Sequence, residues 1–327
     1  MSVFVRSIPL LILSVVALFS ARLATAQSVA TNPVGYNVFN LPAGNSLRVN
    51  TFVQPTAYQS TAASYVSGTT PGTSVVTISS SGSALTSGTY NAGSSGPIYY
   101  MEVLTTGSAQ GLIVDVISNG TNTITVNANL ANFGVTQTTS FCIRPHTTLA
   151  SLFPANCGLT SVDSVKLFFP NNTSQVFSFT GSGDGWAFGN VDVGGQIIYP
   201  AQGFIITTQG AESVSIMGYV KPGPTIVPLY AGALNAVGTV NPMLSGTQTL
   251  STYNLPAALG LFDTAKVFTD DGTLSCPQGA YVYNGTAMVD GSGNNVGSTT
   301  VNPGDSLVVN VQNNEYLTLP SFYTSGN

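Results

Sequence analysis

An internal repeat limits the fold of this chain more than any other feature of its sequence. SVKLFFPNNT (164–173) matches TAKVFTDDGT (264–273) at an offset of 100 residues. PAQGFIITTQGAESVSIMGY (200–219) matches PGDSLVVNVQNNEYLTLPSF (303–322) at an offset of 103 residues. Self-similarity at a fixed spacing predicts that one structural unit is present twice.

A third match indicates that the first copy is interrupted. VFNLPAGNSLRVNTFVQP (38–55) resembles IVPLYAGALNAVGTVNP (226–242) at an offset of 188 residues, which exceeds 103 by 85. The extra residues must lie between about 58 and 146. Within them, residues 99–130 look like successive antiparallel strands, so we expect a separate β module inserted there.

The pattern along the chain is that of strands and turns. Short runs of Val, Ile, Tyr, Phe and Thr alternate with Gly, Asn, Ser and Pro, and Asn119-Gly120, Asp271-Gly272 and Asn284-Gly285 are hairpin signals. One short helix is expected to begin at Thr147 or Thr148. The predicted fold is all-β, with two repeat-related β-sandwich-like units, the first interrupted by a small β-barrel or β module.

The expected division of the chain follows from this repeat. Residues 1–26 form a signal peptide, residues 27–58 plus 146–222 the first unit, residues 59–145 the inserted module and residues 223–327 the second unit. The leader has a basic residue, an apolar run from Ile8 to Phe19 and an Ala24-Thr25-Ala26 cleavage site. It predicts an exported protein of the cell surface, the periplasm or the extracellular space, without a membrane span after cleavage.

Charge excludes one class of partner and favours another. Two of the seven basic residues lie in the leader, which leaves five against 12 acidic residues and a net charge near −7. This balance argues against nucleic acid, which needs a basic surface. Charged residues make up only 6% of the chain and mean hydropathy is +0.29. Such a surface suits packing against copies of the same chain, other envelope proteins or glycans.

FCIRPHTTLASLFPANC (141–157) contains His146, the only histidine, between Cys142 and Cys157. Export favours disulfides, and Cys142 paired with Cys157 would leave Cys276 alone; the alternative is that neither is paired, because pairing cannot be derived from sequence. One histidine cannot build a His-rich zinc site, and no G-x-S-x-G nucleophile motif occurs. We therefore interpret this stretch as a structural joint where the module ends.

Three further features are candidates for binding. Asp184, Asp192 and Asp290 lie in Gly- and Asn-rich loops that resemble oxygen-ligand calcium loops, although hairpin turns explain them equally. Trp186 is the only tryptophan and is either a core residue or, if exposed, a stacking platform for a sugar. No cofactor is expected, and no pair of carboxylates stands in a glycosidase-like motif.

Several segments resemble a known family. NPVGYN (32–37), LPAG (41–44), IRPHTTLASLFP (143–154) and VPLYAGALNAVGTVNP (227–242) follow in the order seen in an uncharacterised family of exported proteins, multiplied in verrucomicrobial genomes. The resemblance implies export and an all-β fold, but no activity and no catalytic residue. Cys142 departs from the family pattern, so a bridge to Cys157 would be particular to this chain.

The function expected from sequence is therefore non-enzymatic. The leading hypothesis is a surface or structural protein that self-assembles, with SVATNPVGYNVFN (28–40) either a strand of its own sheet or one added to a neighbour's sheet. The alternatives are a carbohydrate-binding or adhesin-like secreted protein, with Trp186, Tyr99 and Tyr100 as candidate contacts, and a glycoside-active enzyme.

Overall fold

A computed structural model describes residues 34–79, 83–181, 183, 185–238, 248–269, 276, 279–301 and 305–320. The predicted leader, Asp184 and Asp271-Gly272 lie outside these residues. Strands account for 47% of the chain and helices for 5%, which confirms the all-β class. The described residues belong to one compact unit. No helix within the described residues is both long and apolar enough to cross a bilayer.

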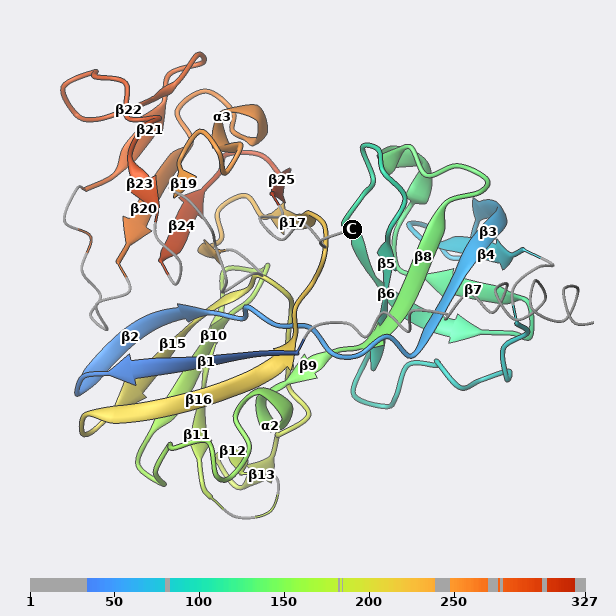
Figure 1. The fold of residues 1–327 in the computed structure, drawn as a ribbon, viewed down its shortest axis with the longest axis horizontal. Helices are drawn as coiled ribbons and strands as arrows, with labels where there is room; N and C mark the ends of the chain where they lie inside the picture. The colour runs from blue at the N-terminus through green and yellow to red at the C-terminus, as the bar shows by residue number, and fades with distance from the viewer. Residues whose placement is uncertain are drawn as a thin grey trace, which may run out of the picture. The chain divides into compact units, whose positions relative to one another are not determined.

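The first part of the fold is a two-stranded ribbon that shares a core with a six-stranded sheet (Figure 1). Ribbon strands β1 (Val34–Leu41) and β16 (Glu212–Tyr219) are antiparallel. The sheet has the order β13-β12-β11-β10-β15-β2, with β2 (Gly44–Val49), β10 (Ser164–Phe168), β11 (Ser174–Phe179), β12 (Trp186–Phe188), β13 (Val191–Asp192) and β15 (Gly203–Thr208).

Alternation along these strands produces the core. Phe39, Val214 and Ile216 of the ribbon and Leu167 and Phe204 of the sheet are buried in one cluster, because every second side chain of a strand points to the same face. The segment 34–40 therefore belongs to the chain's own sheet through β1.

The strands between residues 58 and 145 close into a six-stranded barrel, in the order β3-β4-β7-β6-β5-β8. They are β3 (Tyr58–Ser67), β4 (Ser74–Ile78), β5 (Tyr99–Val103), β6 (Ile113–Asn119), β7 (Thr123–Val126) and β8 (Ser140–Pro145). A short 3-10 helix, η1 (Leu130–Phe133), follows β7. The predicted Asn119-Gly120 turn joins β6 to β7, with the Gly120 amide donating to the Thr123 carbonyl.

Residues 141–157 run from the barrel into a short helix, as the sequence indicated. Strand β8 ends at Pro145, β9 (Thr147–Thr148) pairs with β14 (Ile197–Ile198), and helix α2 (Leu149–Leu152) follows. Thr148 caps the helix by accepting from the Ser151 amide, so the predicted helix start is confirmed.

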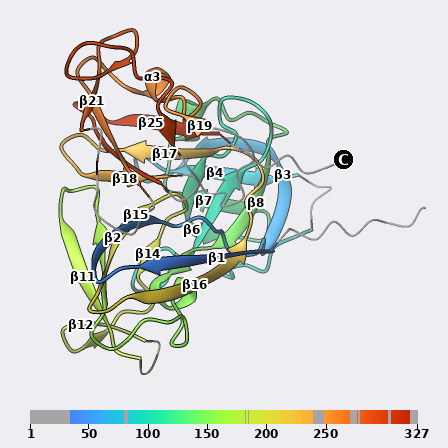
Figure 2. The ribbon, with the colours of Figure 1, turned by 60° about the vertical axis from the view of Figure 1, so that its left-hand side comes forward.

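The last third contains a second antiparallel strand pair and a five-stranded sheet. Figure 2 shows β17 (Thr225–Leu229) beside β25 (Glu315–Leu319), which pair antiparallel. The accompanying sheet has the order β18-β24-β20-β21-β22, with β18 (Asn235–Val237), β20 (Thr264–Phe268), β21 (Tyr281–Tyr283), β22 (Met288–Val289) and β24 (Ser306–Asn310). A further pair consists of β19 (Gln248–Thr249) and β23 (Thr300–Val301).

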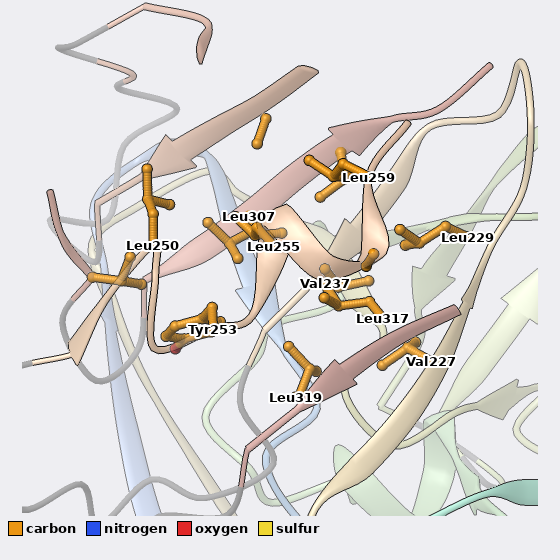
Figure 3. Close-up of a cluster of buried hydrophobic side chains, with 14 of the residues drawn as sticks. Val227, Leu229, Val237, Leu250, Tyr253, Leu255, Leu259, Leu307, Leu317 and Leu319 are labelled. Carbon is orange, nitrogen blue, oxygen red and sulfur yellow. The ribbon is translucent and has the colours of Figure 1, made fainter. Parts of the chain in front are cut away.

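A compact apolar cluster fills this part of the molecule (Figure 3). Leu255 and Leu259, in and after helix α3 (Leu255–Ala258), lie against Leu307 of β24 and Leu317 of β25. Tyr253 is buried in the same cluster, and burial raises the pKa of its hydroxyl. The helix was not expected from the sequence; its Pro256 lies in the first turn, where proline is tolerated.

Basic side chains are mostly inside the protein. Arg48, Arg144 and Lys221 are buried, whereas Lys166 and Lys266 are half-buried in strands β10 and β20. Arg48 lies over the Phe39 ring at 5.5 Å and donates to the Leu47 carbonyl. No basic residue of the described chain is therefore fully exposed.

Candidate functional site

The outer face of three barrel strands carries a set of polar side chains. In β5 the inward-pointing Met101 and Val103 belong to the barrel core, so their neighbours Tyr100 and Glu102 point outward. The registers place Tyr100 opposite Asp115 of β6 and Arg144 of β8, and place Glu102 opposite Cys142. Tyr100, Glu102, Cys142 and Arg144 are nevertheless buried, because other segments of the chain cover this face.

An ionic triad is at the centre of this covered face. The Glu102 carboxylate lies 3.0 Å from Arg144 Nε and 2.9 Å from Lys221 Nζ. Arg144 also donates to the Gln54 carbonyl at 2.8 Å, and Lys221 to the Pro224 carbonyl. Burying charges is costly unless each is paired and hydrogen-bonded, and here both conditions are met. The triad joins the barrel to segments that precede and follow it in the chain.

The two cysteines of the joint are not paired. Cys142 Sγ lies 3.6 Å from the Glu102 carboxylate, and burial and then the nearby carboxylate raise the thiol pKa to about 12. Cys157 is buried in the core that also holds Trp186. Both are free thiols, so the considered Cys142–Cys157 disulfide is absent from the structure. The reason is that β8 directs Cys142 to the outside of the barrel, whereas Cys157 enters the core under the ribbon.

His146 is enclosed by aromatic rings and one carboxylate. Its ring centroid is 5.1 Å from that of Tyr100 and 5.1 Å from that of Tyr199. Nε2 is 3.1 Å from an Asp115 oxygen, but neither ring nitrogen makes an aligned hydrogen bond. Within the described residues, no three His, Cys, Asp or Glu side chains are grouped as metal ligands would be.

A cavity of about 480 Å³ adjoins this cluster. Aromatic side chains line it, and the Tyr199 hydroxyl donates to Asp115 Oδ2 at 3.1 Å. Phe133 and Tyr316 make an edge-to-face pair with centroids 5.0 Å apart. The rest of the lining includes two more aromatic rings, several aliphatic side chains and a few amides: Phe168, Phe169, Leu112, Val114, Ile197, Ile226, Val227, Asn127, Gln196, Gln202 and Asn235.

The hydroxyls of Tyr199 and Tyr230 remain protonated donors in the cavity. Burial, followed by the charge of Asp115 and its hydrogen bond, raises the pKa of Tyr199. Burial also raises the pKa of Tyr230, with further contributions from Tyr316 and Asp115. A neutral phenol beside a carboxylate can orient a ligand but is a poor nucleophile. The cavity therefore has the character of a binding site: apolar walls with a few convergent polar groups.

Trp186 cannot serve as a sugar platform. Its side chain is buried, packs edge-on against Phe179 and donates from Nε1 to the Phe153 carbonyl at 3.1 Å. Tyr100 is also buried, and Tyr99 is half-buried against Tyr90. Of the two alternatives for Trp186, burial supports the core residue. Tyr100 likewise has no exposed ring face for a sugar, because other segments cover this side of β5.

The calcium candidates do not form a site in the described residues. Asp192 accepts from the Gly194 amide, and Asp290 accepts from the Ser292 amide and from Asn294. These hydrogen bonds, first among them those from Asn294, lower the pKa of Asp290. Both loops are explained as Asx-type turns, and Asp184 lies outside the described residues.

No local sequence signal indicated the cavity. Asp115 was visible only as one of several carboxylates, and Tyr199, Tyr230 and Tyr316 come from three separate segments. Tyr316 and Tyr230 come together only because β25 pairs with β17. This pairing places Tyr316 opposite Pro228, two residues before Tyr230. The nearest available hint was that each tyrosine lies in or next to a predicted strand or turn.

Comparison with protein-family models, with curated proteins and with solved structures found no match.

Proposed function

We propose that this protein is an exported, non-enzymatic glycan-binding protein and that the cavity beside Asp115 receives a sugar ring. One observation carries the proposal: Phe133, Tyr199, Tyr230 and Tyr316 line one cavity together with a carboxylate. A sugar offers a C–H face that packs on aromatic rings and hydroxyls that bond to carboxylates and amides. Aromatic side chains with a polar handle suit such mixed surfaces.

Binding rather than hydrolysis is favoured by the carboxylates. Glycoside hydrolysis uses two carboxyl groups on either side of the scissile bond. Asp115 is the only Asp or Glu among the described residues that line the cavity. Glu102, the other carboxylate of this region, is neutralised by Arg144 and Lys221. A glycoside-active enzyme would need a second carboxylate supplied from elsewhere.

The proposal is tested with a glycan array followed by calorimetry on the mature chain. We expect Tyr316→Ala to weaken binding of any glycan hit about tenfold or more, since loss of an aromatic contact costs about 1–2 kcal/mol. Tyr36→Ala is the matched control, because Tyr36 and Tyr316 are both exposed strand tyrosines, at 64% and 51%. Absence of any glycan ligand, or equal loss in both variants, would contradict the proposal.

Self-assembly is a second candidate, favoured by the outer face of the ribbon. Val34, Tyr36 and Met217 are exposed at 67%, 64% and 67%, and Tyr36 pairs directly with Met217. An apolar stripe on an almost uncharged surface favours contact with other copies or envelope proteins. Negative-stain microscopy over a concentration series, with and without calcium, tests this; Tyr36→Lys should reduce any assembly, and discrete monomers throughout would argue against it.

We also infer that the two ribbon-and-sheet parts are copies of one unit. Asp163 accepts from the Thr160 and Gln209 amides, and Asp263 accepts from the Gly260 and Gln312 amides. Leu41 pairs with Glu212 in the first part, and Leu229 pairs with Glu315 in the second. In both ribbons a leucine of the first strand therefore lies opposite the glutamate that begins the second strand. These equivalences support a first unit of 27–58 plus 146–222 and a second of 223–327, with 59–145 inserted. Export rests on the leader at 1–26 and is tested by finding the N-terminus of the secreted chain at Gln27.

A further inference from the structure

Asp115 is the only acidic or basic side chain among the described residues that line the cavity. Arg144 and Lys221, which are buried on the same side of the barrel, are both bound to Glu102. Among the described residues, no lysine or arginine lines the cavity. The cavity therefore has a net negative charge, in a protein whose charged residues are few.

The Asp115 carboxylate is incompletely satisfied by the protein. It can accept about four hydrogen bonds, yet the Tyr199 hydroxyl is the side chain that donates to it in good geometry, at 3.1 Å. His146 Nε2 lies 3.1 Å from the other oxygen without an aligned hydrogen bond. The carboxylate remains 21% exposed. A half-satisfied carboxylate between apolar walls favours a ligand that brings donors and positive charge.

The rings around the carboxylate strengthen this preference. Phe133, Tyr199, Tyr230 and Tyr316 line the same cavity, and the face of an aromatic ring attracts a cation. Aromatic rings beside a carboxylate form the combination by which proteins recognise ammonium groups. A neutral sugar would use the apolar walls but would leave this electrostatic feature unused.

We propose that the ligand is a glycan bearing a free amine, namely a deacetylated amino sugar whose ammonium group lies against Asp115 and the tyrosine rings. This inference rests on the proposed glycan-binding function and names its ligand class. The C–H face of the sugar packs on the rings that line the cavity, and amides such as Asn127 and Gln202 are within the same cavity for its hydroxyls. The ammonium donates to the carboxylate that the Tyr199 hydroxyl already orients.

Calorimetry with three probes tests the inference on the mature chain. The probes are a glucosamine trimer, the N-acetylglucosamine trimer of equal length and tetramethylammonium chloride. We expect the glucosamine trimer to bind at least about tenfold more tightly than the acetylated trimer, equivalent to about 1.4 kcal/mol. Asp115→Asn should remove this difference, because the amide keeps an acceptor for Tyr199 but has no charge. Asp192→Asn makes the same charge change at an exposed position outside the cavity and should preserve the difference.

The outcomes separate the two proposals. Equal binding of both trimers overturns the amine preference and leaves the glycan-binding function intact. Binding of tetramethylammonium without either trimer overturns both, because the cavity would then hold simple ammonium ions. No binding of any probe, with a glycan array also negative, likewise overturns both. If Asp115→Asn lowers the melting temperature, Tyr230→Ala provides the second variant, and a retained preference for the amine there would contradict cation recognition by the rings.

Discussion

Replacing Glu102 by glutamine tests how much the buried triad of Glu102, Arg144 and Lys221 stabilises the folded protein. The change keeps the shape of the side chain and removes its charge, so that Arg144 and Lys221 remain buried without a counterion. Glu102 makes two charge-assisted contacts, at 3.0 and 2.9 Å, each worth about 1.5–3 kcal/mol. Each cation retains one backbone carbonyl. We therefore expect a loss of about 3–5 kcal/mol in the free energy of unfolding, the range found when a buried pair loses one member.

Guanidinium unfolding followed by circular dichroism and by the fluorescence of Trp186 measures this loss. Glu315→Gln is the matched control, since Glu315 is half-exposed at the start of β25, and it should cost less than about 0.5 kcal/mol. Urea unfolding at low and high salt gives a second readout. The loss should be similar at both salt concentrations, because salt screens a buried pair little. The double variant Glu102→Gln with Lys221→Met should recover part of the loss. A loss below about 1 kcal/mol, or one that salt abolishes, would refute the reasoning.

Three further predictions use other parts of the molecule. A thiol reagent near neutral pH should label Cys276 in the folded protein and spare Cys142 and Cys157. Both of the latter are buried, and the pKa of Cys142 is raised to about 12. Mass spectrometry locates the label, and modification of Cys142 without unfolding would contradict the buried site. Each of the variants Asp163→Asn and Asp263→Asn should lower the free energy of unfolding by about 1–3 kcal/mol. The two losses should be similar and additive in thermal unfolding. A large effect of only one variant would argue against equivalent roles. Calcium or a chelator should leave the melting temperature unchanged within about 1 °C, and a clear rise with calcium would restore a metal role for the acidic loops.

Local signals accounted for much of the fold. Asn119-Gly120 specified a hairpin and Thr148 a helix start because each acts on backbone groups within a few residues. The alternation in β10, β15 and β20 depends only on neighbouring residues along each strand. The all-β class followed from such signals, whereas the role of the β1 segment required knowledge of its partner, β16.

The candidate site depended on contacts that local patterns do not encode. Whether Trp186 is buried depends on what covers its strand, and its glycine-rich surroundings have no clear alternation. Cys142 and Cys157 are close in sequence, yet strand direction and the joint at Pro145 send them to different surroundings. The meeting of Asp115 with Tyr199 requires the barrel and the later segment to be placed together, and no motif spans that distance in the chain.

The burial of the basic side chains has a consequence for resistance to proteolysis. Trypsin-like proteases cut after lysine or arginine and need an extended, accessible stretch of backbone. Arg48, Arg144 and Lys221 are buried, and Lys166 and Lys266 lie inside hydrogen-bonded strands. Since these five are all the basic residues after position 26, we expect this part of the folded chain to resist such enzymes.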